Sequence, residues 1–409
     1  MNYPELLSPA GSFACVEAAF DHGADAVYAG IGQYNLRAHS PNFTIEDLPE
    51  LLSYTHGRGK KIYLTLNIMP DQKTLCEMEK TIKQLAMADT MPDALIVSDP
   101  GVIDLCREII PDIPLHLSTQ TGSFNIRSAG FWKRQGITRI VLPRELSIDQ
   151  IKEITETKIV ETEIFIHGAM CVSISGRCLM GAYIGGRHPN LGDCPQPCRL
   201  KYRITALSVD EKEINELEAE ETKRGVYLLN SRDLCTIDII PELIETGVNS
   251  FKIEGRNKSP FYVASVVKVY RAAIDSYIND PESFSVKTEW IEELGNIEHR
   301  TYTTGFYKKE LELQDVFTTK AQSGYRVIGM VKAVLEGGVP VIDVKNSFCS
   351  DDRIEVVPVQ QSLAPYGITF TKLTDLSGNL IGRAPSNRLI LGHGCLKLRP
   401  GDMLRVAMV

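Results

Sequence analysis

The sequence predicts an α/β protein: a (β/α)8 barrel with a Cys-rich insertion between its seventh and eighth strands, followed by a small C-terminal antiparallel β-barrel. Three observations support this fold class. Short apolar strands alternate with amphipathic helices through the first half of the chain. Several of these strands are continuously apolar, as parallel strands covered on both faces are. Beyond residue 325, helix signals nearly vanish and short alternating strands follow.

The predicted barrel strands end in polar residues or glycine, and in a closed barrel these ends meet on one face around one pocket. An eighth strand, Ser250–Ile253, follows a helix-like run at Thr236–Thr246 and ends at Glu254, Gly255 and Arg256. The seven earlier candidates are Glu5–Leu7, Ala26–Ala29, Ile62–Asn67, Ala94–Ser98, Leu115–Ser118, Arg139–Leu142 and Glu163–Ile166, with Ser8, Gly30, Asn67, Ser98, Ser118 to Gln120, Arg144 and His167 at or after their ends.

Helix start signals lie between these strands. Ser12 precedes an apolar-periodic run and is a candidate N-cap. The pairs Thr44 with Asp47 and Ser147 with Gln150 have the spacing of a capping box. A long helix at about 260–277 is expected to close the barrel.

The chain is expected to have three parts: a barrel at 1–278 containing the insertion 171–234, a linker or bridge at 279–324, and a β-barrel at 325–409 that binds or positions a partner. Within the insertion, extended stretches at 202–206 and 226–229 predict a hairpin with a charged, solvated tip.

The composition is that of an ordinary soluble protein, with 409 residues, 43% hydrophobic and 23% charged. No stretch approaches the roughly 18 apolar residues of a membrane span, and the N-terminus has no signal-peptide pattern. We therefore expect a cytoplasmic protein with reduced cysteines and no membrane contact. The net charge of −8 argues against non-specific coating of nucleic acid but allows a local basic patch.

The insertion opens with four cysteines at the spacing C-x6-C-x15-C-x3-C: Cys171, Cys178, Cys194 and Cys198. Loops rarely bury thiols, so a core role is the weakest of three interpretations. A structural zinc ion is an alternative, although such sites usually use closely paired cysteines. A 4Fe–4S cluster is favoured, because it takes four thiolates at irregular spacing. Cys235 could replace Cys198 as the fourth ligand.

Basic residues accompany the cysteines. Arg177, Arg187 and Arg199 would offset the negative charge of thiolates and cluster, and Arg177 and Arg199 are also candidate contacts to RNA phosphates. Charge compensation and salt bridges explain these arginines equally well.

Other candidate site residues follow the strands. Lys252, Arg256 and Lys258 surround Glu254 and could bind a small carboxylate; alternatively Lys252 and Glu254 form a buried ion pair. The candidate catalytic residues are His167, Glu254 and Arg256, and the candidate substrate-binding residues are Arg37, Asn67, Gln120, Lys252, Lys258, Arg177 and Arg199. Asn67, Gln120 and His167 could instead be satisfied polar groups of the barrel mouth.

The sequence lacks the usual motifs of two enzyme classes. The sequence contains no H-E-x-x-H pair and no G-x-S-x-G elbow, so the common metallopeptidase and serine-hydrolase sites are absent. A carboxylate mechanism using Glu163 or Glu254 is left open. Gly30-x-Gly32 lacks the third glycine of a dinucleotide site.

Several motifs together resemble the U32 peptidase (collagenase-like) family. They span nearly the whole chain: LLSPAG at 6–11, AVYAG at 26–30, FIHGAMCVSISGRC at 165–178, CPQPCR at 194–199, SFKIEGRNKS at 250–259 and HRTYTTGFY at 299–307. The family name implies a protease, the alternative function. Better-assigned members are cluster-bearing hydroxylation proteins that act on tRNA wobble uridine, on ribosomal RNA cytidine or on a ubiquinone precursor.

The resemblance implies Cys171, Cys178 and Cys194 as cluster ligands, with Cys198 or Cys235 as the fourth. The two-domain layout looks most like the tRNA-hydroxylation branch, which makes 5-hydroxyuridine and draws on prephenate. The expected partners are therefore tRNA and a small carboxylate metabolite, and a related partner chain is left open. A zinc-bearing RNA-binding protein is the non-enzymatic alternative.

Overall fold

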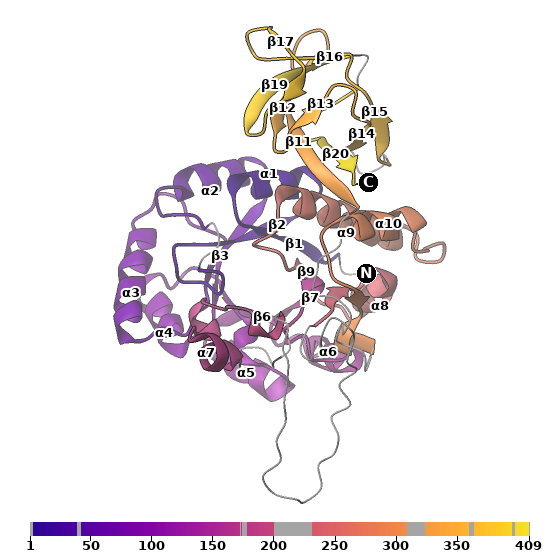
Figure 1. Cartoon of the computed structure of the whole chain (residues 1–409). Helices are drawn as coiled ribbons and strands as arrows, with labels where there is room; N and C mark the ends of the chain where they lie inside the picture. Colours follow the sequence, from indigo (N-terminus) through magenta and orange to yellow (C-terminus); the bar gives the residue numbers. More distant parts are fainter. Residues whose placement is uncertain are drawn as a thin grey trace, which may run out of the picture.

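A closed barrel of eight parallel strands forms the larger part of the protein, as predicted (Figure 1). The computed structural model describes residues 3–38, 42–171, 173, 178–199, 231–308, 324–359, 364–394 and 397–408. Neighbouring strands pair in sequence order, and β9 closes the barrel by pairing with both β1 and β7. The strands are β1 (Glu5–Ala10), β2 (Ala26–Gly30), β3 (Lys61–Leu66), β4 (Ala94–Val97), β5 (Leu115–Leu117), β6 (Ile137–Val141), β7 (Glu161–Ala169) and β9 (Ser250–Ile253).

Helices surround the barrel and bury their apolar faces against it. The layer comprises α1 (Phe13–Asp21), α2 (Leu48–Gly57), α3 (Gln72–Ala86), α4 (Pro100–Ile109), α5 (Ile126–Arg134), α6 (Ile148–Glu156), α8 (Ile240–Glu245) and α9 (Pro260–Asn279). Ser12 caps α1, and Ser147 with Gln150 forms the predicted capping box of α6. Asp47 accepts a hydrogen bond from the Thr44 backbone N–H, one half of the predicted box, but α2 begins only at Leu48.

The interior of the barrel is ionic as well as apolar. The Glu163 carboxylate is fully buried and lies 2.8 Å from the Lys252 ammonium and 3.4 Å from the Arg139 guanidinium. Arg139 in turn lies 2.6 Å from Glu5, whose other oxygen accepts a hydrogen bond from Tyr63. Charges buried this deeply require partners because desolvation is costly. The network therefore joins strands β1, β3, β6, β7 and β9 across the barrel.

A bulge in β7 changes which side chains face the interior. Glu163 and Phe165 point into the barrel, where they contact Lys252. The pairing of β7 with β9 shifts by one residue between Phe165 and His167. Because one extra residue reverses the alternation of a strand, His167 turns outward and packs on Tyr270 of α9.

Two short strands outside the barrel extend its sheet. β8 (Asp233–Cys235) pairs antiparallel with the end of β7, and β10 (Tyr302–Thr303) pairs with β8. The Cys-rich segment contributes α7 (Met180–Gly185) and the short 3-10 turns η2 (Pro189–Leu191) and η3 (Pro197–Arg199). The remaining 3-10 turns are η1 (Thr119–Thr121), η4 (Ile237–Ile239) and η5 (Gly305–Lys308). The hairpin predicted at 202–206 and 226–229 lies outside the described residues.

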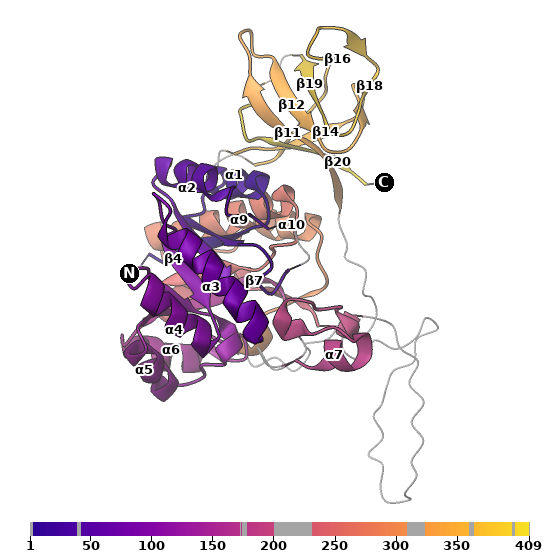
Figure 2. The ribbon, with the colours of Figure 1, turned by 90° about the vertical axis from the view of Figure 1, so that its left-hand side faces the viewer.

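The C-terminal region is a curled antiparallel sheet, as predicted, on the α1 and α9 side of the barrel (Figure 2). Its strands are β11 (Tyr325–Val334), β12 (Pro340–Val344), β13 (Phe348–Cys349), β14 (Ile354–Val357), β15 (Tyr366–Ile368), β16 (Lys372–Thr374), β17 (Leu380–Ile381), β18 (Arg383–Ala384), β19 (Arg388–His393) and β20 (Met403–Ala407). One helix, α10 (Thr288–Asn296), lies within the segment predicted to be a linker or bridge.

Buried polar contacts join the two parts. The Arg405 guanidinium of β20 lies 2.8 Å from Glu293 of α10 and also pairs with Glu355 of β14. The Lys268 ammonium of α9 donates to the Pro358 carbonyl at 2.8 Å. These interactions fix the sheet against α9 and α10. None of the described helices is long and apolar enough to cross a membrane.

The buried network predicts the effect of removing one of its charges. Glu163→Met leaves Lys252 without its partner inside the barrel, and we expect it to lower the free energy of unfolding by about 3–5 kcal/mol. The double variant Glu163→Met with Lys252→Met removes both charges of the pair and should recover much of this loss. Urea unfolding of wild type, both single variants and the double variant measures it. A double variant no more stable than Glu163→Met would contradict the pairing.

Candidate functional site

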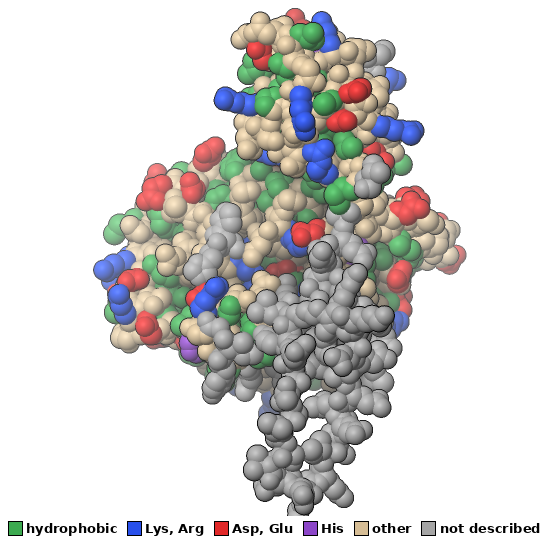
Figure 3. All heavy atoms as spheres, in the orientation of Figure 1, with side chains coloured by type: hydrophobic (Ala, Val, Ile, Leu, Met, Phe, Trp, Pro, Cys, Tyr) green, Lys and Arg blue, Asp and Glu red, His purple; other side chains and the backbone are tan. Residues whose placement is uncertain are grey.

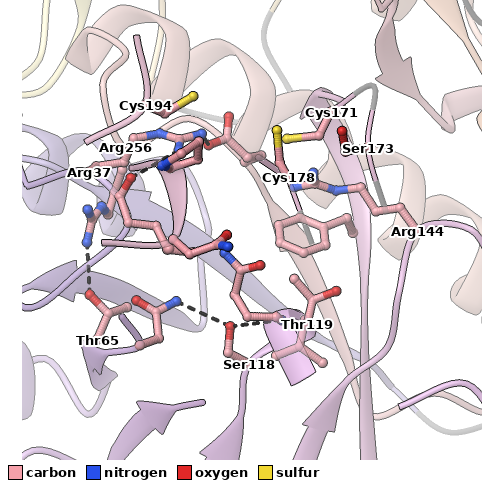
Figure 4. Close-up of a pocket in the computed structure, with 18 of the residues that line it drawn as sticks. Arg37, Thr65, Ser118, Thr119, Arg144, Cys171, Ser173, Cys178, Cys194 and Arg256 are labelled. Atoms are coloured by element: carbon pink, nitrogen blue, oxygen red, sulfur yellow. Dashed lines mark hydrogen bonds and ion pairs between the residues drawn. The ribbon is translucent and has the colours of Figure 1, made fainter. Parts of the chain in front are cut away.

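A cavity of about 180 Å³ opens at the carboxyl ends of the barrel strands, under the Cys-rich segment (Figure 4). Its inner wall comes from strands: Tyr28 of β2, Phe165 of β7 and Lys252 of β9. Its rim comes from the loops that follow the strands, as expected for a barrel enzyme. The lining also includes Arg37, Asn67, Thr119, Gln120, Arg144, Cys171, Cys178, Cys194, Cys198, Glu254 and Arg256.

The Cys-rich segment is held over the cavity by backbone contacts. The Met69 N–H, just after β3, donates to the Asn190 carbonyl at 3.1 Å. Gly192 has φ +87°, and a Cβ at this position would lie 2.3 Å from the Asn35 carbonyl oxygen. Only glycine allows the segment to approach the loop after β2 so closely. The segment therefore forms a cover fixed at two points.

Four predicted cysteine ligands come together here: Cys171, Cys178, Cys194 and Cys198 all line the cavity. Among the described residues, no three His, Cys, Asp or Glu side chains converge closely enough to hold a single metal ion. A zinc site needs its sulfurs about 2.3 Å from one ion. Both a zinc ion and a 4Fe–4S cluster take four thiolates, so the same four residues would hold either group.

Cys235 lies elsewhere. It faces His167 across the β7–β8 pair and accepts a hydrogen bond from the Tyr270 hydroxyl at 3.7 Å. Burial raises the pKa of its thiol to about 11, and it does not line the cavity. This placement favours Cys198 over Cys235 as the fourth member of the group.

Arg37 connects the cysteines with Glu254. Its guanidinium lies 3.1 Å from the Glu254 carboxylate, in the cavity wall as predicted. Burial would lower the pKa of Arg37, but Glu254 and then Cys171 and Cys194 raise it above its ordinary value. A permanent cation therefore stands beside two of the four thiols. The Lys252–Glu254 ion pair considered from the sequence does not form, because each residue has another partner.

Arg256 is buried in the cavity wall and is already bonded. Its guanidinium donates to Thr65 at 2.9 Å and to the Asn35 side chain. A Cβ on Gly30 would lie 2.5 Å from this guanidinium, so the glycine at the end of β2 makes room for it. Burial lowers the pKa of Arg256 to about 10, which still leaves it charged near neutral pH.

His167 does not lie in the cavity, contrary to its proposed catalytic role. Its ring is 1% exposed and sits among the rings of Tyr262, Tyr270 and Tyr302. Burial lowers its pKa to about 3, so the imidazole is neutral at physiological pH. The bulge in β7 is the reason, since it turns this side chain toward the helices.

The other basic residues selected from the sequence either lie away from the cavity or fall outside the described residues. Lys258 pairs with Glu298 at 3.3 Å and does not line the cavity. Arg187 pairs with Asp193 at the surface. Arg177 lies outside the described residues, as does the side chain of Arg199.

Asn67 and Gln120 line the cavity as predicted. Asn67 donates to Ser118 at 3.2 Å, and its carbonyl oxygen is buried without a partner among the described residues. The sequence placed Arg144 at a strand end facing the pocket without naming it as a binding residue, and it did not indicate Tyr28 or Phe165. The inward alternation of β2 and β7, and the position of Arg144 after β6, are the signals that could have found them.

The family model and the relatives with similar sequences point to the same family. The model of peptidase family U32 matches residues 11–316. The chain is 41% identical to tRNA hydroxylation protein P1 of Bacillus subtilis, over 98% of this chain and 94% of that protein. It is 34% identical to tRNA hydroxylation protein P of Escherichia coli, covering 95% and 92%. The 23S rRNA 5-hydroxycytidine C2501 synthase of E. coli is 39% identical over 68% of this chain and 40% of that protein.

The placement of His167 predicts a pH effect on stability without a role in the reaction. The pKa of His167 is about 3 in the folded state and near 6.5 in the unfolded state. Between these pH values the unfolded state therefore binds a proton at His167 that the folded state does not bind. Stability contributed by the neutral ring is present above pH 6.5 and is lost as the pH falls toward 3. Between pH 7 and 5, wild type should lose about 2 kcal/mol more than His167→Gln. Urea unfolding at both pH values tests this, and equal losses would contradict the assigned burial.

Proposed function

The chain belongs to peptidase family U32, and we propose that it is an RNA hydroxylase that makes 5-hydroxyuridine at the tRNA wobble position, with a 4Fe–4S cluster and prephenate as co-substrate. The observation that carries this proposal is the group of four cysteines around the mouth of one barrel cavity. The names of the relatives supply the substrate class: two are tRNA hydroxylation proteins and one hydroxylates ribosomal RNA. The full-length match to the tRNA group favours tRNA.

Cys171, Cys178, Cys194 and Cys198 would hold the cluster, at the opening rather than deep in the barrel. A bound cluster supplies one-electron transfer close to the cavity. Arg37 stands beside Cys171 and Cys194, where its charge offsets the negative charge of thiolates. The Glu254 carboxylate fixes Arg37 in this position through their 3.1 Å ion pair. Zinc in the same residues is the alternative.

The walls of the cavity would hold and shield the reacting molecule. Tyr28, Ile96, Val141 and Phe165 give it apolar sides that exclude water. Asn67 and Thr119 each present a buried side-chain oxygen without a partner among the described residues, available to a bound ligand. Lys252 forms the floor of the cavity, and its ion pair with Glu163 fixes the position of the ammonium group.

The C-terminal sheet offers a second surface for RNA. Figure 2 places β18 on the same side of the molecule as α7, which lies next to the cavity. Arg383 of β18 and Arg388 of β19 are exposed, and blue side chains of this sheet face the viewer in Figure 3, the side on which α7 lies in Figure 1. Exposed arginines on the side of the opening suit the phosphates of an RNA that reaches the cavity.

Proteolysis is less well supported. No histidine lines the described part of the cavity, and His167 is enclosed by tyrosines. Glu254, the carboxylate left open as a catalytic group, is paired with Arg37. The described part of the cavity therefore offers a peptide substrate no histidine and no unpaired carboxylate that could act as a general base.

Deletion of the gene tests the proposed reaction. We expect tRNA from the deletion strain to lose 5-hydroxyuridine and its derivatives at the wobble position, measured by mass spectrometry of digested tRNA. A plasmid copy should restore them, and a copy with Cys171→Ser should not. Unchanged modification in a strain that also lacks any related gene would exclude this function.

The cluster assignment predicts different effects for two cysteines. After anaerobic purification, Cys198→Ser should lose most of the protein-bound iron and sulfide, because Cys198 lines the opening. Cys235→Ser should retain both, because its thiol is bonded to Tyr270 away from the opening. Iron and sulfide analysis with visible spectra measures this. The reverse pattern would assign the fourth position to Cys235, and zinc in a colourless wild type would remove the cluster from the proposal.

A further inference from the structure

Asn35, in the loop that follows β2, is fully buried although its side chain is polar. Its side-chain oxygen accepts one hydrogen bond from the Arg256 guanidinium and another from the Arg37 backbone N–H, which lies 2.9 Å away. Its side-chain nitrogen donates to the Gly32 carbonyl at 3.1 Å. Both acceptor positions of the oxygen are thus used to fix the backbone at Arg37.

Arg256 ties this loop to the barrel. It follows β9, its side chain is 5% exposed, and its guanidinium also donates to Thr65 of β3 at 2.9 Å. The donors of a guanidinium form a rigid, planar fork, so this one side chain links the end of β9 to β3 and to the loop after β2. The position of Asn35 is therefore set by the barrel strands.

The backbone of Asn35 also contacts the Cys-rich segment. Gly192, two residues before Cys194, comes so close that a Cβ on this glycine would lie 2.3 Å from the Asn35 carbonyl oxygen. Figure 4 shows Cys194 on the same side of the cavity as Arg37 and Arg256. Asn35 thus holds a guanidinium through its side chain and meets the segment that carries a thiol through its backbone.

The position of Arg37 affects any redox group that the thiols hold. Arg37, Cys171 and Cys194 line the same cavity. One-electron reduction adds one negative charge to an iron–sulfur cluster, and a fixed cation nearby makes the uptake of that electron more favourable. The Glu254 carboxylate, 3.1 Å from the Arg37 guanidinium, carries the opposite charge and opposes this effect.

We infer that Asn35 is a positioning residue of the cysteine site: held by Arg256, it keeps Arg37 beside the thiols, where the guanidinium raises the reduction potential of the bound cluster. Arg256, a catalytic candidate from the sequence, then acts through Asn35. The inference rests on the proposed 4Fe–4S cluster and concerns the regulation of its potential. It gives Asn35 and Arg256 a role that involves no contact with a substrate.

Redox titration of the full-length, anaerobically purified protein without RNA tests this inference. Dithionite supplies the electron, and electron paramagnetic resonance of the reduced cluster gives the midpoint potential. Arg37→Gln should lower the potential because the cation is lost, and Arg37→Lys should stay closer to wild type because the charge is kept. Glu254→Gln should raise the potential because an anion is lost. A general loss of structure would not shift these two neutral variants in opposite directions.

A double-mutant cycle tests the role of Asn35. Asn35→Ala should lower the potential less than Arg37→Gln does, since Arg37 keeps its charge but loses its anchor. If Asn35 acts through Arg37, the double variant should show no further decrease below Arg37→Gln alone. Asn35→Ser keeps a hydroxyl for the Arg256 contact, should give a smaller decrease than Asn35→Ala, and tests the same point if Asn35→Ala folds poorly.

Lys258→Gln is the matched control, because it removes a cation that pairs with Glu298 outside the cavity, and its potential should equal that of wild type. Additive decreases in the double variant, or shifts of the same sign for Arg37→Gln and Glu254→Gln, overturn the inference whether or not tRNA is hydroxylated. A wild type that holds zinc and shows no redox signal overturns it as well. The predicted shifts in a protein that leaves tRNA unmodified support the inference and count against the proposed function.

Discussion

The ion pair between Lys252 and Glu163 is the interaction on which the cavity depends. Both side chains are buried inside the barrel, where a lone charge would be prohibitively costly. Glu163 also contacts Arg139, which continues the network to Glu5 at the start of the first strand. A barrel interior is usually filled by branched apolar side chains. Here a charged layer takes their place, and the Lys252 ammonium, 4.3 Å from the centre of the Tyr28 ring, becomes the floor of the site.

Above that floor, the site is built from two kinds of element: the barrel strands, and the loops and Cys-rich segment that follow them. The strands supply Tyr28, Phe165 and Lys252, whose positions are fixed by sheet hydrogen bonds. The loops after the strands supply Arg37, Asn67, Thr119 and Arg144, and the Cys-rich segment covers them. A redox centre at the opening and an organic anion beneath it would then lie within one cavity while the RNA stays outside.

The C-terminal sheet is held to the barrel by contacts that leave the cavity untouched. Arg405 reaches Glu293, and Lys332 of β11 pairs with Glu17 of α1 at 2.7 Å. Because α1, α9 and α10 lie on the outside of the barrel (Figure 1), the sheet extends the protein sideways from the opening. A large substrate such as tRNA could then contact both parts, whereas a small carboxylate needs only the barrel.

The sequence by itself determined the barrel, the C-terminal sheet and the clustering of Cys171, Cys178 and Cys194, with Cys198 or Cys235 left open as the fourth, because strand periodicity and the clustering of cysteines are local properties of the chain. It also placed Arg37, Asn67 and Gln120 correctly, since residues after parallel strands must meet at one end of the barrel. Only the tertiary structure decided the partners. A one-residue bulge turned His167 outward, where its ring packs on Tyr270 of α9. Which carboxylate neutralises which cation depends on distances across the barrel, so Lys252 could be assigned to Glu163 and Glu254 to Arg37 only in three dimensions.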